Sequence, residues 1–299
     1  MQTQAQRSPQ QGARRDIITS ARFPITVTEN YVEANGINIW YAEAGQGIPL
    51  LLLHGGIVSN GPLWADSAYG WGGHLGRFAE HFRVIAPDTR GHGRTLNPSG
   101  VLSYPVFAED VVALTRALQL EKPFLCGFSD GGITASVVGI MAPDLPRAIV
   151  NLAGLDMFDP DPDSSSRVMN RTWLGGDPHA TKAKSTRPDL PPAMDQKVIA
   201  DFEPTQGTGY ITAYFDQLFD LWTVPMEYTT DDLAKTTAPT LILVGDRETS
   251  LGVEEAVTVY RTLPHGELGV IPNADHGISS LAGTMALDFL LRQRAAVSE

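Results

Sequence analysis

A serine near the middle of the chain stands in a pattern that suits nucleophilic chemistry. Residues 127–131 read Gly-Phe-Ser-Asp-Gly and fit G-x-S-x-G, the pattern of a nucleophile elbow. The serine of such a turn adopts a strained backbone conformation, and the flanking glycines avoid collisions with neighbouring backbone. An apolar run ends at Leu125 just before the pattern, and a helical pattern over 133–141 follows it. We therefore predict that Ser129 is a nucleophile at a strand–helix turn.

A serine nucleophile needs a base that takes its proton and later returns it to the leaving group. Imidazole titrates in the right range, and the chain has seven histidines. His276 is the predicted base, because it follows the last predicted strand and completes the chain order Ser…acid…His. We expect His54 and His92 to brace loops. The remaining histidines are expected to be exposed: His74, His81, His179 and His265.

The acid that orients the imidazole is expected after a predicted strand at 240–244. The sequence there is Gly-Asp-Arg-Glu, so both Asp246 and Glu248 are candidates. A tetrahedral intermediate also needs two N–H donors aimed at its oxyanion. We predict the backbone N–H groups of Asp130 and Gly56, because Asp130 follows the nucleophile and Gly56 lies in the loop His-Gly-Gly after another strand. This chemistry needs no cofactor and no metal.

The elements that would position these residues alternate between strand and helix. A hairpin over 31–43, with Asn35-Gly36 at its turn, begins the pattern. Predicted strands follow at 49–53, 82–86, 123–125, 147–153, 240–244 and 269–271. Predicted helices lie at 104–118, 133–141, 253–263 and 277–292, and a loop is expected over 60–74. The strand at 49–53 is continuously apolar, as a strand buried on both faces should be, and the alternation of strands with helices predicts an α/β fold with a mostly parallel central sheet flanked by helices.

The alternation breaks between 156 and 232, where Pro, Gly, Asp and Ser cluster. We interpret 156–232 as an inserted lid, or cap, domain, 23–155 and 233–299 as the core, and 1–22 as a disordered N-terminal tail. A helix is predicted over 209–222 inside the insert. Its aromatic residues are expected to pack onto the main domain, and some of them to roof an apolar pocket.

Composition limits the classes of partner. The chain has 299 residues, of which 42% are hydrophobic, and a formal net charge of −12. That charge argues against nucleic acid and anionic membrane surfaces as partners. The single cysteine excludes an internal disulfide framework and a cysteine-based zinc motif. We expect a cytoplasmic protein that acts on a small molecule, and the sequence leaves its oligomeric state open.

Five motifs in order resemble those of α/β-hydrolase-fold enzymes. They stand at 54–56, 88–93, 127–132, 245–248 and 275–277. The resemblance covers 31–156 and 239 to the end. The stretch 127–135 is similar to the valacyclovirase (biphenyl-hydrolase-like) esterases, which hydrolyse α-amino-acid esters. In those enzymes the acidic residue after the nucleophile engages the substrate's amino group, and by position that residue is Asp130. A side chain that only caps the following helix is the alternative for Asp130.

The resemblance also indicates which residue is the acid that orients His276. The family's usual G-x-x-D pattern places the acid at Glu248, which leaves Asp246 to bind loop backbone. Some members carry the acid after an earlier strand, and Asp156 is that third candidate.

The resemblance implies a serine hydrolase that cleaves a small carboxylic ester, lactone or amide through an acyl-enzyme. Relatives on this scaffold that cleave C–C bonds or form peracids supply one alternative. A hydrolase-like ligand receptor, whose lid reports a bound molecule, supplies the other.

Overall fold

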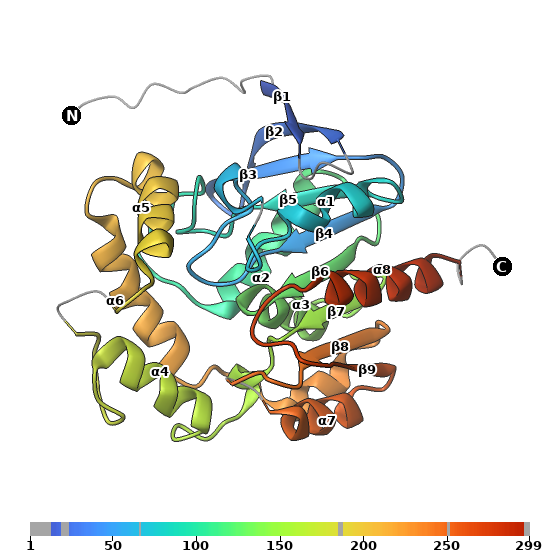
Figure 1. Cartoon of the computed structure of the whole chain (residues 1–299). Coiled ribbons are helices and arrows are strands. Elements are labelled where there is room, and N and C mark those ends of the chain that lie inside the picture. The colour runs from blue at the N-terminus through green and yellow to red at the C-terminus, as the bar shows by residue number, and fades with distance from the viewer. Residues whose placement is uncertain (1–12, 19–23, 66, 185–187, 250–251, 296–299) are drawn as a thin grey trace.

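The computed structural model describes residues 13–18, 24–65, 67–184, 188–249 and 252–295 (Figure 1). The strands are β1 Ala13–Ile18, β2 Pro24–Ala34, β3 Ile37–Ala44, β4 Pro49–Leu53, β5 Arg83–Pro87, β6 Phe124–Phe128, β7 Ile149–Leu152, β8 Thr240–Gly245 and β9 Gly266–Ile271. The α-helices are α1 Gly72–Ala79, α2 Tyr104–Ala117, α3 Asp130–Met141, α4 Ser165–Gly175, α5 Pro192–Gln206, α6 Tyr210–Thr223, α7 Val253–Thr262 and α8 Ser280–Ala295.

The described strands form one nine-stranded sheet in the order β1-β2-β3-β5-β4-β6-β7-β8-β9. The pairs that join β1, β2, β3 and β5 are antiparallel. Every pair from β5 across to β9 is parallel, so the predicted mostly parallel sheet is confirmed. Parallel strands bring their carboxyl ends to one edge of the sheet. The loops after β4, β6, β8 and β9, which carry the predicted site residues, therefore meet at that edge.

Both faces of the sheet are covered by helices, and β4 shows how the sequence achieves this. Leu51 and Leu53 join an apolar core with residues of α2, α3 and α7, whereas Leu50 and Leu52 join a second core with residues of α1 and α8. Successive side chains of a strand point to opposite faces, so a strand covered on both faces is apolar throughout. The continuous apolar run in the sequence is the direct consequence.

The N-terminal half differs from expectation in two places. A loop is predicted over 60–74, but α1 already begins at Gly72. Glycine is a poor helix former, and the glycines around its start obscure the helical pattern. Ala13–Ile18 pair antiparallel with β2, so this part of the expected disordered tail is a strand. The tail residues 1–12 and 19–22 lie outside the described residues.

In the described part of the chain between β7 and β8 lie the α-helices α4, α5 and α6, which we call the cap (Figure 1). The predicted helix over 209–222 is confirmed as α6. Tyr214, Phe215 and Phe219 of α6 are buried in the same apolar core as α2 and α3. The cap therefore packs onto the rest of the chain, while the boundaries 156–232 stay a prediction. Within the described residues, no helix combines the length and the apolar character that a membrane crossing requires.

Candidate active site

Ser129 stands at the sharp turn between β6 and α3. Its backbone has φ 53° and ψ −123°, a strained conformation for a residue with a side chain. A Cβ at Gly127 would collide with the carbonyl oxygen of Gly131, and a Cβ at Gly131 would collide with that of Leu53. Both glycines of the pattern are therefore required by close backbone approach, as predicted.

The structure brings Ser129, His276 and Glu248 together from three separate loops. The Nε2 atom of His276 lies 3.1 Å from the Oγ atom of Ser129, and its Nδ1 atom lies 2.7 Å from Oε2 of Glu248. The Glu248 side chain is fully buried, whereas that of His276 is 34% exposed. A carboxylate only accepts hydrogen bonds, so Nδ1 carries the proton and Nε2 accepts the hydroxyl proton of Ser129. This is the arrangement that a serine nucleophile requires.

The loops that carry Glu248 and His276 are joined backbone to backbone. The Arg247 N–H donates to the carbonyl oxygen of Ala274 over 2.9 Å, and the Ala274 N–H donates to Oδ1 of Asp246 over 3.3 Å. Asp246 therefore binds loop backbone, as expected for the residue next to the strand end. Asp156, the third candidate for the acid, opens a short 3-10 helix after β7, and its side chain lies outside the described residues.

His54 and His92 brace loops, as predicted. The Thr89 N–H donates to Nε2 of His54 over 2.9 Å, so the proton of His54 is on Nδ1 and is donated to the carbonyl oxygen of Gly55 over 2.7 Å. Complete burial lowers the pKa of His54 to about 4 and that of His92 to about 3. Both imidazoles are therefore neutral at physiological pH, and neither is poised to act as a base.

His74 corrects the expectation that four histidines are exposed. It lies in α1 and is buried, with Nε2 3.2 Å from the carbonyl oxygen of Ile278. Burial lowers its pKa. Its ring lies against Trp71, and its contact with Ile278 ties α1 to the segment just before α8.

The predicted oxyanion donors belong to Asp130, which follows Ser129 in the chain, and to Gly56, which follows Gly55. A Cβ at Gly55 would lie 3.0 Å from the Cβ of Ser129. Within the described part of the chain, the backbone N–H groups of Gly56 and Asp130 have no hydrogen-bond acceptor in the protein. A Cβ at Gly56 would lie 2.5 Å from the Trp222 ring and 2.6 Å from Oδ2 of Asp130. Glycine at position 56 is therefore required by the close approach of these two side chains.

A cavity of about 350 Å³ opens next to Ser129 and His276. Its other walls come from α4, α6 and the start of α2, and include Tyr104, Met169, Asn170, Trp173 and Trp222. The rings of Trp173 and Trp222 are stacked, with centroids 6.1 Å apart. The volume suits a small ligand, and the walls are largely apolar. The prediction that cap aromatics roof an apolar pocket therefore holds for Trp222.

The Asp130 side chain also borders this cavity. Its Oδ1 atom accepts hydrogen bonds from the Tyr104 hydroxyl over 2.8 Å and from Nε1 of Trp222 over 3.0 Å. Burial raises the pKa of Asp130 to about 6, although these two donors oppose the rise. The carboxylate thus links α3 to the cap and to α2, and its donors among the described residues are these two side chains and not an N–H group of α3.

The sequence missed several residues of the cavity. Tyr104 reads only as the start of a helix, and nothing local connects it with Asp130. Met169 and Trp173 stand four residues apart, which is helical spacing, and that signal could have located a wall-forming helix. Asn170 lies on the same helix, and its Nδ2 donates to the carbonyl oxygen of Trp222 over 3.4 Å.

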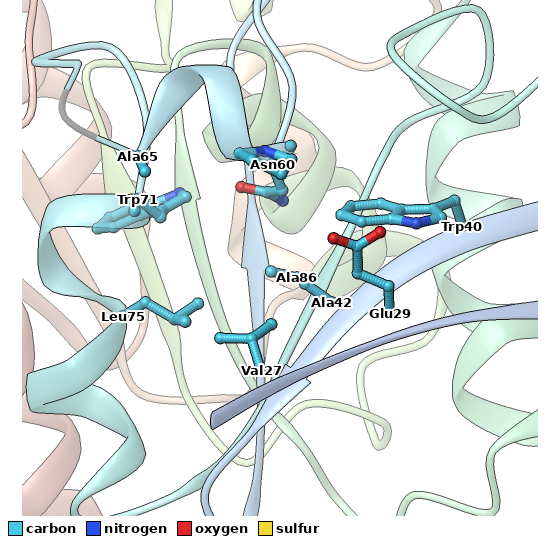
Figure 2. A pocket seen from close by; sticks show the side chains of 12 residues that line it. Val27, Glu29, Trp40, Ala42, Asn60, Ala65, Trp71, Leu75 and Ala86 are labelled. Atoms are coloured by element: carbon cyan, nitrogen blue, oxygen red, sulfur yellow. The ribbon is translucent and has the colours of Figure 1, made fainter. Parts of the chain in front are cut away.

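A much smaller cavity lies between the β2–β3 hairpin and α1 (Figure 2). Its volume of about 30 Å³ is close to that of one water molecule. Val27, Trp71 and Leu75 line it, and the Glu29 carboxylate lies next to Trp40. This cavity is too small for an organic substrate. Among the described residues, no group of three or more His, Cys, Asp or Glu side chains is arranged to hold a metal ion.

Known proteins resemble this chain in sequence, one of them over most of its length and another over about half of it. A Synechocystis sp. protein assigned as a non-heme chloroperoxidase is 26% identical over 270 residues, which are 85% of this chain and 93% of that protein. Human serine hydrolase BPHL is 32% identical over 149 residues, 48% of this chain and 49% of the human protein. Epoxide hydrolases also occur among the relatives.

The fold is shared with solved hydrolases. The crystal structure of carboxylesterase CesB from Bacillus subtilis superposes with a TM-score of 0.66, covering 91% of this chain and 94% of that one at 20% identity. The family model described as "Alpha/beta hydrolase family" matches residues 50–286. That range holds Ser129, Glu248, His276 and the whole cap. The chain therefore belongs to the alpha/beta hydrolase family and has its fold.

Proposed function

We propose that this hydrolase cleaves small carboxylic esters, lactones or amides through an acyl-enzyme intermediate. The observation that carries the proposal is the hydrogen-bonded series Ser129–His276–Glu248, which ends at a cavity of about 350 Å³. The geometry matches the roles of nucleophile, base and orienting acid. Relatives that include a serine hydrolase support the same chemistry.

The reaction proceeds in two displacements. The Oγ atom of Ser129 attacks the substrate carbonyl carbon while Nε2 of His276 takes the hydroxyl proton, and the Gly56 and Asp130 N–H groups bind the oxyanion. The intermediate collapses to an ester on Ser129 as His276 returns the proton to the departing alcohol or amine. Water then attacks this acyl-enzyme with His276 again as the base, which releases the carboxylic acid and regenerates the Ser129 hydroxyl.

Turnover of a panel of p-nitrophenyl esters and lactones tests the proposal. Because the cavity is small, acetyl and butyryl esters should turn over faster than esters of long-chain acids. The expected sign of an acyl-enzyme is a rapid burst of p-nitrophenol before steady turnover. Binding of the esters without release of p-nitrophenol would instead support a ligand receptor.

The alternatives on the same scaffold require other observations. Epoxide hydrolases attack with an aspartate carboxylate, whereas Ser129 occupies the nucleophile position of this chain. A C–C hydrolase or a perhydrolase would use the same three side chains. Peracid formation from a short carboxylic acid and hydrogen peroxide, assayed beside ester hydrolysis, separates the perhydrolase from the esterase.

Within this proposal, the kind of ester that the enzyme prefers depends on Asp130. We propose that its buried carboxylate pairs with the ammonium group of an amino-acid ester, as in the similar valacyclovirase-type esterases. The two groups that donate to it, Tyr104 and Trp222, are neutral, so neither supplies a positive charge to pair with the carboxylate. An ion pair is stronger in a cavity walled by apolar groups than in water.

The ratio of kcat/KM for an amino-acid ester to kcat/KM for a matched neutral ester is expected to rise as pH increases through about 6. Below that pH Asp130 is protonated and does not attract an ammonium group, and above it the carboxylate is charged. Taking the ratio cancels the ionisation of His276, which both substrates share. In Asp130→Asn the ratio should be low and independent of pH. A ratio that is flat in the unmodified enzyme would refute amine recognition and leave ester hydrolysis untouched.

A further inference from the structure

The loop that carries the proposed oxyanion donor is held at both of its ends. The Nδ1–H of His54 donates to the carbonyl oxygen of Gly55 over 2.7 Å. That carbonyl and the Gly56 N–H belong to the same planar peptide unit and point in opposite directions. His54 therefore fixes the rotation of the peptide unit that carries the Gly56 N–H, the proposed oxyanion donor.

The next peptide unit is held from the cap. The Ile57 N–H donates to the Tyr214 hydroxyl over 2.8 Å, and Tyr214 belongs to α6. Ile57 has a φ of 54°, a left-handed conformation that a β-branched residue rarely adopts. A strained residue persists only where its surroundings hold it, and the Tyr214 hydroxyl is the partner of its N–H.

The Tyr214 hydroxyl is itself oriented by His92. Nδ1 of His92 lies 3.0 Å from the carbonyl oxygen of Arg90, and a carbonyl only accepts, so Nδ1 carries the proton. Nε2 of His92 then accepts from the Tyr214 hydroxyl over 2.9 Å. With its proton committed to His92, the Tyr214 oxygen presents its lone pairs to the Ile57 N–H. The donor and the acceptor of each hydrogen bond in the series Arg90–His92–Tyr214–Ile57 are thus determined.

We propose that Tyr214 is a positioning residue, through which the cap fixes the oxyanion donor of Gly56 by holding Ile57. The inference rests on the proposed function, because it assumes that the Gly56 N–H binds the oxyanion. A cap that moves away from the core would release Ile57 and loosen that donor. Transition-state stabilisation, rather than substrate binding alone, would then depend on the seating of the cap.

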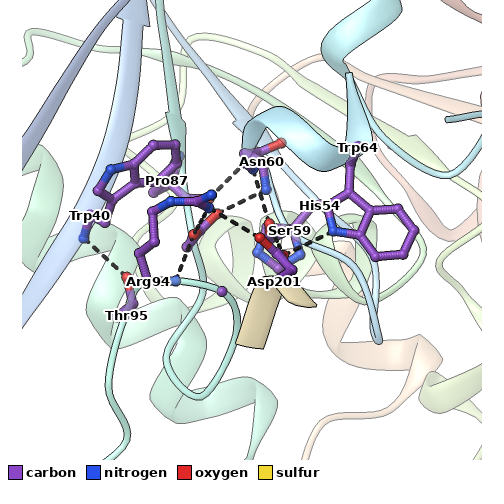
Figure 3. Close-up of polar contacts among 12 residues, drawn as sticks. Trp40, His54, Ser59, Asn60, Trp64, Pro87, Arg94, Thr95 and Asp201 are labelled. Atoms are coloured by element: carbon purple, nitrogen blue, oxygen red, sulfur yellow. Dashed lines mark hydrogen bonds and ion pairs between the residues drawn. The ribbon is translucent and has the colours of Figure 1, made fainter. Parts of the chain in front are cut away.

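The cap offers a matched control on the same helix. The Tyr210 hydroxyl donates to the carbonyl oxygen of Gly91 over 2.9 Å, so it also ties α6 to a core loop, and within the described residues no hydrogen bond joins it to the loop 54–57. A separate network holds α5. Oδ2 of Asp201 accepts from Ser59 over 2.5 Å and from Nε1 of Trp64 over 2.9 Å, and its Oδ1 lies 3.4 Å from Nη1 of Arg94 (Figure 3). Removing one hydroxyl from α6 therefore leaves the cap in place.

The test compares Tyr214→Phe with Tyr210→Phe in the full chain. Tyr214→Phe is expected to lower kcat on a p-nitrophenyl ester by about 10- to 100-fold with little change in KM, because a displaced group in the site costs about that much. Affinity for a trifluoromethyl ketone, which forms an oxyanion on Ser129, should fall by a similar factor. Tyr210→Phe should change kcat and ketone affinity by less than about threefold, although both variants lose one hydrogen bond.

Three results would decide the matter. Equal kinetic losses in the two variants, in step with equal losses of melting temperature, would assign Tyr214 a purely structural role and overturn the inference. A normal kcat and ketone affinity in folded Tyr214→Phe would overturn it as well. Activity that survives in Ser129→Ala would remove the proposed function itself, so the two failures are distinguishable.

Discussion

Replacement of Ser129 by alanine is expected to lower kcat on small esters by roughly three orders of magnitude or more. The hydroxyl is the group that forms the covalent bond in the proposed mechanism, and among the described residues its Oγ atom is the hydroxyl oxygen placed 3.1 Å from Nε2 of His276. The residual rate would come from binding and from the oxyanion donors, which the substitution leaves in place.

The fold should survive this substitution. Ser129 already has a positive φ with a Cβ present, so alanine adds no new strain at the turn. Thermal unfolding of Ser129→Ala should therefore match the unmodified protein within a few degrees. A fluorophosphonate probe should label the unmodified chain once and fail to label the variant. Ser165→Ala, at an exposed position outside the cavity, is the control and should keep both activity and labelling. Wild-type activity in folded Ser129→Ala would end the serine-hydrolase proposal.

The features that the sequence predicted well depend on short stretches of chain. The elbow is recognisable because steric collisions at Gly127 and Gly131 demand glycine within two residues of the serine. β4 is recognisable because burial on both faces makes it continuously apolar. Chain order and the shared carboxyl edge of the sheet then place the loops of Ser129 and His276 side by side.

The features that the sequence missed depend on contacts between distant segments. Tyr214 is a buried aromatic residue at helical spacing, and in the sequence it is indistinguishable from Phe215, which only packs. Its hydroxyl gains a role from His92 and Ile57, which are more than a hundred residues away. The link from Trp222 to Asp130 spans 92 residues and escapes local patterns for the same reason. Tertiary contacts of this kind decide the shape of the cavity, so the sequence indicated the chemistry better than the substrate.

The sequence left Asp246 and Glu248 as neighbouring candidates for the acid that orients His276, and substitution of each one distinguishes between them. Glu248→Gln is expected to lower kcat by about two to four orders of magnitude while preserving the fold. Glutamine has the same length, so packing around position 248 is retained. It removes the charge that stabilises the imidazolium of His276, and its amide group can donate to Nδ1. That donation would move the histidine proton to Nε2, where it blocks proton transfer from Ser129.

Asp246→Asn is the matched control, because asparagine keeps the oxygen that accepts from the Ala274 N–H. Its kcat should stay within a few-fold of the unmodified enzyme. The opposite pattern, an active Glu248→Gln and a folded but inactive Asp246→Asn, would transfer the role to Asp246. The distances favour the first outcome. Glu248 reaches Nδ1 of His276 at 2.7 Å, whereas the Asp246 carboxylate is engaged with the backbone of the loop that carries the histidine. One carboxylate then orients the imidazole, and its neighbour holds the loop on which that imidazole stands.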